Sequence, residues 1–274
     1  MHRTICGTTQ MNQTAASRSI CARFAAAART YHDESNLQRT VASKLAASIM
    51  PLEQIDCVLE IGCGTGLLTE LLRRDFPDAA IHAVDIARPM IDLAKDRIGE
   101  YRMNWHVADA RQLCLDRDFP LIISSSALHW MTPVSDTIKR LAGMLEPGGN
   151  LVSALMVKGT FEELHNAREC LFPNKTAKVC LPPAEKILEA IAAAGLKIVS
   201  SRQEVLMERY DSACGFFRSL NWQGVTGTAD NGCSLLNRTE LRKLILYYDQ
   251  RFAAPAGGVF ATYRVLYVKA GKAK

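Results

Sequence analysis

The sequence predicts an α/β protein built on a doubly wound, mostly parallel sheet, with an antiparallel last strand and a helical cap insertion. Apolar runs alternate with helical patterns at short intervals, which is typical of a parallel sheet covered on both faces. One such run, residues 58–61, passes straight into a glycine-rich turn and a leucine-rich helical pattern. Residues 207–256, before the last apolar run, are far too many for a plain hairpin loop. We therefore expect them to form a cap.

The sequence of the N-terminal part predicts a disordered tail followed by two helices. Residues 1–20 are polar, so we expect a disordered tail ahead of one domain at 21–274. The tail is also free of acids, which leaves a transit peptide as an alternative. Apolar residues at fourfold spacing predict N-terminal helices within 23–50, and the polar segment 31–36 divides them.

The remaining elements follow from hydrophobic periodicity and turn residues. Strands are expected at 58–61, 78–85, 103–107, 119–124, 150–156, 197–205 and 258–268. Helices are expected at 67–75, 89–98, 134–145, 181–194, 211–220 and 238–248, with a turn at 146–149. A second, partly helical insertion at about 158–180 is expected to join 207–256 in the cap.

Composition narrows the class of protein. The 274 residues are 48% hydrophobic and 22% charged, as in ordinary globular proteins, and no apolar run reaches the length of a membrane span. A net charge of +5 is too weak for a dedicated nucleic-acid binder. The nine cysteines lack both Cys-x-x-Cys and zinc spacing, so we expect reduced thiols and no metal. We therefore expect a cytoplasmic protein, monomeric, that binds neither nucleic acid nor membrane.

The most informative residues lie around the glycine turn. An acid, Glu60, precedes a Gly-x-Gly-x-Gly run made of Gly62, Cys63, Gly64, Thr65 and Gly66. Glycines allow backbone angles that a Cβ forbids, and the following helix offers free N–H groups to an anionic ligand. A second acid, Asp85, closes the next strand, where a carboxylate can accept hydrogen bonds from both hydroxyls of a ribose.

This arrangement resembles motif I of class I S-adenosylmethionine (SAM) methyltransferases, a Rossmann-like fold. The resemblance implies SAM as cofactor and S-adenosyl-L-homocysteine as product. It implies that Glu60 orders the loop and reaches the methionine ammonium, that Asp85 takes the ribose, and that Ile86 flanks the adenine. The adenine amino group would meet Asp109 and Ala110, although Asp109 is equally well explained as a helix cap. Met90 is also expected in this site, from the inward face of the following helix.

The segment after the fourth strand borders the sulfonium end of such a cofactor. It contains Ser126, His129 and Trp130. An aromatic face attracts a cationic centre, so we expect Trp130 beside the methionine portion, with an ordinary core tryptophan as the alternative. We weigh His129 equally as a general base and as a loop residue with a structural hydrogen bond.

A narrower resemblance is to the malonyl-[acyl carrier protein] O-methyltransferases of early biotin synthesis. It runs from about residue 22 to the end and is carried by residues 24–31, 37–39, 159–164, 181–183, 218–220 and 262–263. Two positions depart from the family pattern. His129 stands where glutamine is frequent, and 221–224 differ from the usual Lys-x-Ile-Gly.

This family implies a specific acceptor: the malonyl thioester of an acyl carrier protein, or of coenzyme A. Its carboxylate is already ionised at neutral pH, so no general base is needed. A bidentate arginine would anchor it; we expect Arg218, with Arg39 or Arg264 as alternatives. Tyr31 and Gln38 would close over the cofactor, or serve only as packing.

The carrier protein is acidic, and basic residues of the cap would receive it. These are Arg238, Arg242 and Lys243, which are equally typical of a solvated helix face.

Two rival functions remain at this stage. One is a methyltransferase for another small carboxylic acid, a quinone precursor or RNA, the last disfavoured by the weak basic charge. The other is a SAM-binding assembly factor that no longer transfers a methyl group.

Overall fold

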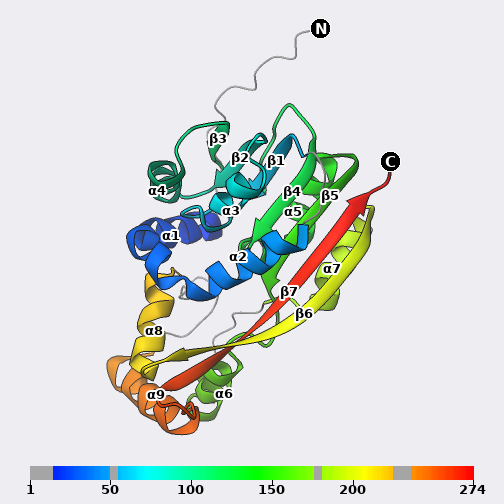
Figure 1. Ribbon diagram of the computed structural model, residues 1–274. Helices are drawn as coiled ribbons and strands as arrows, with labels where there is room; N and C mark the ends of the chain where they lie inside the picture. The colour runs from blue at the N-terminus through cyan, green and yellow to red at the C-terminus, as the bar shows by residue number, and fades with distance from the viewer. Residues whose placement is uncertain (1–14, 50–54, 176–180, 225–235) are drawn as a thin grey trace.

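A computed structural model of the protein describes residues 15–49, 55–175, 181–224 and 236–274. Its sheet has seven strands in the order β3-β2-β1-β4-β5-β7-β6 (Figure 1). The strands are β1 Cys57–Ile61, β2 Ala80–Asp85, β3 Met103–Val107, β4 Phe119–Ser125, β5 Leu145–Met156, β6 Leu196–Tyr210 and β7 Val259–Lys272. The first five pair in parallel, and β7 is antiparallel to β5 and β6, which confirms the predicted fold class.

The helices are α1 Ala15–Glu34, α2 Asn36–Ile49, α3 Leu67–Asp75, α4 Arg88–Ile98, α5 Val134–Gly143, α6 Glu162–Leu171, α7 Ala184–Ala193, α8 Ala213–Trp222 and α9 Arg238–Arg251. Single 3₁₀ turns lie at Leu128–Trp130 and Pro173–Lys175. In the described part of the chain, no helix has the length and apolar character needed to cross a membrane.

The central strands of the sheet are buried on both faces. Every residue of β1 is buried, and its side chains alternate between two hydrophobic clusters. Val58 joins the cluster that holds α2 and α3, whereas Leu59 joins the one that holds α5 and α7. A strand covered by helices on both faces has no solvent side, which explains why Glu60 is the single polar residue of β1.

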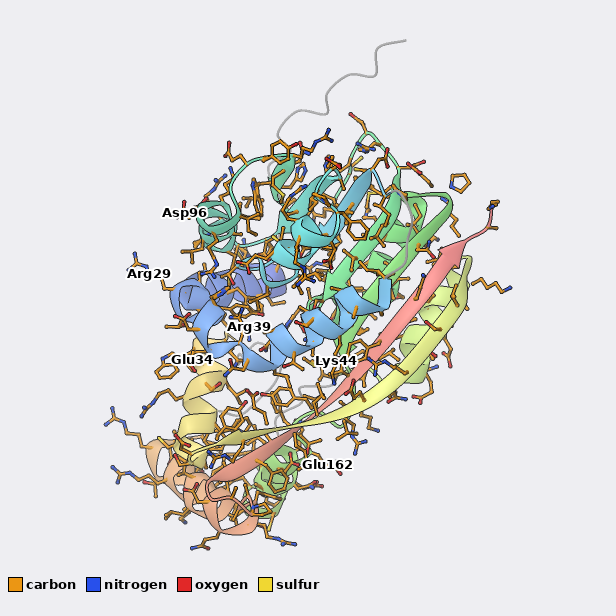
Figure 2. The ribbon with its side chains drawn as sticks, in the orientation of Figure 1. Arg29, Glu34, Arg39, Lys44, Asp96 and Glu162 are labelled. Carbon is orange, nitrogen blue, oxygen red and sulfur yellow. The ribbon has the colours of Figure 1, made fainter. Side chains whose placement is uncertain are left out.

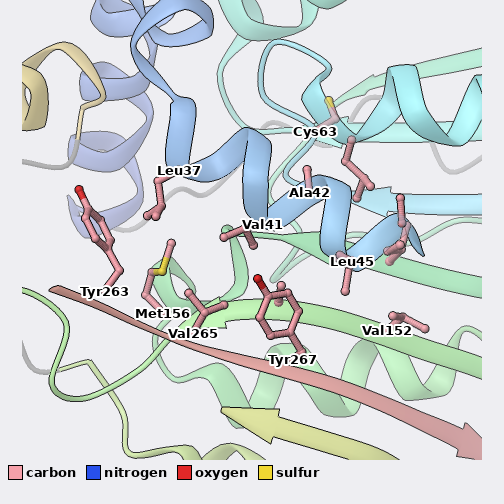
Figure 3. Close-up of a cluster of buried hydrophobic side chains, with 14 of the residues drawn as sticks. Leu37, Val41, Ala42, Leu45, Cys63, Val152, Met156, Tyr263, Val265 and Tyr267 are labelled. Carbon is pink, nitrogen blue, oxygen red and sulfur yellow. The ribbon is translucent and has the colours of Figure 1, made fainter. Parts of the chain in front are cut away.

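Helix α2 shows how a sequence pattern becomes packing. Leu37, Val41, Leu45 and Ile49 recur every four residues and are 0–6% exposed. This stripe lies on the sheet beside residues of β5 and β7 (Figure 3). The predicted division near 31–36 is confirmed, because α1 ends at Glu34 and α2 begins at Asn36. Helix α2 lies on the sheet, whereas α1 covers the carboxyl ends of β1, β2 and β4.

Three boundaries correct the predictions. Helix α1 begins at Ala15, so residues 15–20 of the predicted disordered tail are helical; residues 1–14 lie outside the described ranges. Strands β6 and β7 are longer than predicted, because they pair antiparallel along nearly their whole length. The predicted turn at 146–149 lies within β5, where the pairing with β4 shifts register.

Helices α6, α8 and α9 gather at one end of the molecule (Figure 1). The Asp249 carboxylate of α9 accepts the Ala213 N–H at the start of α8, at 2.7 Å. Phe216 of α8 packs on Tyr248 of α9, with ring centroids 5.4 Å apart. Both predicted cap insertions therefore contribute to one cluster, although 207–210 belong to β6 and 176–180 and 225–235 lie outside the described ranges.

Candidate active site

A cavity lies where the strand order reverses, beyond the carboxyl ends of β1, β2 and β4. In doubly wound sheets this crevice is the usual ligand site. The predicted site residues that line it are Tyr31, Gly62, Gly64, Asp85, Ile86, Met90, Asp109, Ala110, Ser126 and Trp130.

The loop after β1 requires glycine for steric reasons. Gly62 has φ +71°, and a Cβ added there would lie 2.2 Å from the Cβ of Ala127. Gly66 has φ +93° and stands at the N-cap of α3. The loop backbone therefore lies bare against the cavity at Gly62, and any side chain would push the loop away from the end of β4.

Asp85 ends β2 with its carboxylate at the cavity. Its oxygens accept the N–H groups of Gly64 at 3.0 Å and Ala87 at 2.8 Å. Burial raises the pKa of Asp85, and these backbone hydrogen bonds oppose the rise. Each carboxylate oxygen has two lone pairs and receives one N–H here, so each can still accept a ribose hydroxyl.

Glu60 lies beneath the loop rather than at the cavity surface. It is 1% exposed and accepts a hydrogen bond of 2.7 Å from the Thr69 hydroxyl of α3. Burial raises its pKa to about 8. This contact joins the end of β1 to α3, in keeping with the predicted loop-ordering role. The carboxylate does not line the cavity, and its predicted contact with the methionine ammonium through water stays a prediction.

Asp109 is engaged by a residue that the sequence did not single out. Arg111 donates to it from Nε at 3.0 Å, from Nη2 at 2.7 Å and from its backbone N–H at 3.0 Å. Arg111 also bonds to Ser17 of α1. The Asp109 carboxylate thus holds Arg111 beside the cavity, and Arg111 in turn binds α1 through Ser17. Because the carboxylate already accepts these three hydrogen bonds, it is less able to accept one from an adenine amino group. The only signal in the sequence was an acid two residues before an arginine.

The end of β4 presents two buried hydroxyls to the cavity. The side-chain oxygens of Ser125 and Ser126 are buried without a hydrogen-bond partner. Ser126 also has φ +56°, a strained left-handed conformation for a residue with a Cβ. Unpaired buried hydroxyls require a polar partner, and the ammonium and carboxylate of the amino-acid end of SAM can supply one. Together with Asp85 and the bare loop, they match the chemistry of this cofactor.

Aromatic side chains form the opposite wall. Phe24 of α1 meets Trp130 edge-on, with ring centroids 5.6 Å apart. Tyr31 lies near Gly64, and burial together with the Asp85 charge raises its pKa to about 12. The guanidinium of Arg23 lies over Trp130, 5.5 Å from the ring centroid. Helix α1 therefore closes the cavity from above.

His129 and Gln38 do not line the cavity. His129 Nδ1 accepts the Met156 N–H at 3.4 Å, and burial lowers its pKa to about 3. This geometry is that of a loop residue with a structural hydrogen bond, which was the alternative to a general base. Gln38 is 7% exposed and donates to the side chain of Gln223 at 2.9 Å, so it joins α2 to the end of α8.

Arg218 is also not brought to the cavity. It lies exposed on α8, with its guanidinium 5.6 Å from the ring centroid of Trp222.

Three predicted residues of the glycine loop do not line the cavity: Cys63, Thr65 and Gly66. Cys63 and Thr65 point instead into the interior, 4% and 1% exposed.

The fold, the glycine loop and the acid after β2 define a class I SAM-dependent methyltransferase. Residues 58–149 match the methyltransferase domain family. The chain also resembles the solved structure of phosphoethanolamine N-methyltransferase 2 from Haemonchus contortus in complex with S-adenosyl-L-methionine. That similarity has a TM-score of 0.52 at 16% identity, covers 85% of this chain and 52% of the other, and shows the fold.

Two relatives narrow the class. A malonyl-[acyl-carrier protein] O-methyltransferase from Priestia megaterium is 30% identical over 259 residues, which cover 89% of this chain and 93% of the relative. The biotin biosynthesis bifunctional protein BioCD from Bordetella avium is 32% identical over 91% of this chain and 51% of its own length. The chain belongs to the malonyl-[acyl-carrier protein] O-methyltransferase family. It is a SAM-dependent methyltransferase, which confirms the predicted enzyme class and cofactor.

Proposed function

We propose that the protein methylates the free carboxylate of a malonyl thioester carried by an acyl carrier protein, at the start of biotin synthesis. The observation that carries this proposal is the similarity to the Priestia megaterium enzyme along 89% of the chain. When bound, SAM supplies a methyl group on a positively charged sulfur. The residues of this chain then need only hold the acceptor in line with that methyl group and exclude water.

The state of His129 supports a carboxylate acceptor. A hydroxyl acceptor, as in a quinone precursor, must lose a proton to a base, whereas a carboxylate is already ionised. A histidine with a pKa of about 3 is a weak base, and the Nδ1 lone pair of His129 is occupied by the Met156 N–H. Among the described residues lining the cavity there is no histidine.

The acceptor carboxylate needs a cation near the sulfonium end. We assign this role to Arg23, which lies over Trp130 at the aromatic wall and whose pKa is lowered by burial. Arg218 would have to leave the outer face of α8 to serve. Of the alternatives considered from sequence, Arg39 donates to the His32 carbonyl at 2.9 Å and Arg264 pairs with Glu162 at 3.2 Å.

The exposed face of α9 is suited to receive an acidic carrier protein. Arg238, Arg242 and Lys243 are exposed, and none forms an ion pair with an acid in the described ranges. The two acids of this helix are engaged, because Glu240 pairs with Lys175 at 2.8 Å and Asp249 caps α8. Leu241 and Leu246, 42% and 62% exposed, add apolar surface between the cations.

Mass spectrometry of malonyl-[acyl carrier protein] incubated with the enzyme and SAM tests the proposal. We expect one added methyl group, located on the malonyl group by fragmentation of the carrier-bound product. Methylation of free carboxylic acids or a quinone precursor, with none on the malonyl thioester, would replace the proposed acceptor. SAM binding by calorimetry without transfer to any of them would favour the assembly-factor alternative.

A further inference from the structure

Helix α1 covers the cofactor cavity and must be held in place. It contributes Phe24 and Tyr31 to the cavity wall and lies between α4 and α8 (Figure 1). A cofactor in the cavity is enclosed by this helix, so the contacts that hold the C-terminal end of α1 determine how readily the cavity opens.

One residue near that end contacts three separate elements, two through its side chain and one through its backbone carbonyl. His32 Nδ1 lies 3.3 Å from the Thr65 hydroxyl in the glycine loop. Its Nε2 lies 2.6 Å from Arg97 Nη2 on α4, and its backbone carbonyl accepts from Arg39 Nη2 on α2 at 2.9 Å. Figure 2 shows Arg39 where α1 passes into α2.

The partners determine which nitrogen carries the proton. A guanidinium can only donate hydrogen bonds, so His32 Nε2 must accept from Arg97. The ring proton is therefore on Nδ1 and is donated to Thr65. Because Thr65 is 1% exposed, this hydrogen bond fastens α1 to the buried part of the loop that carries Gly62 and Gly64.

The surrounding charges favour the neutral ring. The pKa of His32 is lowered by burial, then by Arg97 and Arg39, while Glu70 and Asp33 act in the opposite direction. Glu70 also pairs with Arg97 at 3.3 Å, so the acid is shared. A second proton would fall on Nε2, where it would face Arg97 and break that contact.

We propose that His32 is a positioning residue that clasps α1 over the glycine loop and thereby sets how tightly and how long SAM is held. His32 does not line the cavity and acts through Thr65 and Arg97. The inference depends on the cofactor site and is independent of which acceptor the enzyme uses.

Replacing His32 by leucine removes both side-chain hydrogen bonds. We expect the SAM dissociation rate and Kd to rise about tenfold, measured by stopped-flow tryptophan fluorescence, since Trp130 lies in the cavity wall. The kcat at saturating SAM should change less than about twofold, because no reacting atom is touched. His32→Asn keeps a donor for Thr65 and should recover part of the loss. His165→Leu, which removes a histidine of the cap with a similarly lowered pKa, is the matched control and should behave as wild type.

The pH dependence separates this role from simple packing. In the wild type, SAM affinity should fall as the pH drops below about 6.5, because a His32 ring released from Thr65 and Arg97 then takes up a second proton that closure of α1 must expel. His32→Leu should lose this part of the dependence, and His165→Leu should keep it. Arg97→Met removes the second partner without altering α1 and should speed SAM release in the same way. A His32→Leu or Arg97→Met enzyme that folds and releases SAM at the wild-type rate with the wild-type pH profile would overturn the proposal.

Discussion

The cofactor end and the cap of this molecule are built in different ways. At the cofactor end, short stretches of chain form the site: a strand, the glycine turn after it and the acid that ends the next strand place Gly62, Gly64 and Asp85 at the cavity. The cap is assembled from segments far apart in the chain. Glu163 of α6 accepts the N–H of Thr262 at 3.0 Å across 99 positions, and Gln223 bonds to the Glu34 carbonyl across 189.

The same difference distinguishes the binding site of SAM from that of the acceptor. The cofactor meets backbone and strand ends that sequence spacing fixes, so its site can be tested residue by residue. In our proposal the acceptor meets surfaces of α1 and α9, whose positions depend on how these helices pack. We therefore expect single changes at the cofactor end to have larger effects than single changes in the cap.

The largest effect is expected from Gly62→Ala. The new Cβ would fall 2.2 Å from that of Ala127, so the loop must shift, and SAM affinity should drop at least about 100-fold, ~2.8 kcal/mol. Gly99→Ala is the matched control: Gly99 has φ +84° but open space around it. It should cost only backbone strain of about 1 kcal/mol in stability and leave SAM affinity unchanged by calorimetry. Equal SAM affinities for the two variants would show that the loop is not the binding surface.

Asp85→Ala should follow, with a loss of about 30- to 150-fold in SAM affinity, ~2–3 kcal/mol. The variant removes two acceptors for the ribose and also frees the Gly64 N–H. Asp92→Ala, on the exposed side of α4, is the control and should bind SAM normally. Unchanged affinity in a folded Asp85→Ala protein would remove Asp85 from the site.

At the acceptor, two arginines are to be compared. Arg23→Ala should raise the KM for malonyl-[acyl carrier protein] about tenfold, ~1.4 kcal/mol, because the carboxylate loses the cation proposed to anchor it. Arg218→Ala should raise it by no more than about threefold, since this arginine is exposed on α8. SAM affinity should be nearly constant in both. The reverse order in steady-state kinetics would restore Arg218 as the anchor and imply that α8 moves on binding.

The cap should show a smaller, carrier-specific effect. Changing Arg238, Arg242 and Lys243 together to glutamate should raise the KM for malonyl-[acyl carrier protein] about five- to tenfold and leave that for malonyl-coenzyme A unchanged. The control places the same charge change on Arg88, Lys139 and Lys197, which are exposed on other elements. If both triple variants respond alike, net charge and not α9 is responsible.

The smallest effect concerns stability rather than binding. His82 of β2 lies 3.1 Å from His106 of β3, between ring nitrogens, and burial lowers its pKa to about 4. A lowered pKa means that the unfolded chain takes up the proton first, so this contribution is complete above about pH 6.5 and is lost as the pH falls toward 4. Urea midpoints at about pH 7.5 and about pH 5 should therefore differ less for His82→Leu than for the wild type. An identical difference would exclude His82 as a source of acid lability.

The predictions from sequence divide along the same line. Gly62 and Asp85 could be placed because a strand end followed by a glycine or an acid fixes its own position in a parallel sheet. Arg111 and Arg23 were not singled out, because their positions beside the cavity wall depend on the packing of α1. The role of Arg218 stays a prediction: residue type alone did not show that it lies exposed on α8.

A crystal structure with S-adenosyl-L-homocysteine would show directly whether this cavity is the SAM site. We expect the ribose hydroxyls on Asp85, the amino-acid end at Ser125 and Ser126, and α1 closed above them. A nucleoside bound elsewhere, with Asp85 contacting only the N–H groups of Gly64 and Ala87, would contradict it.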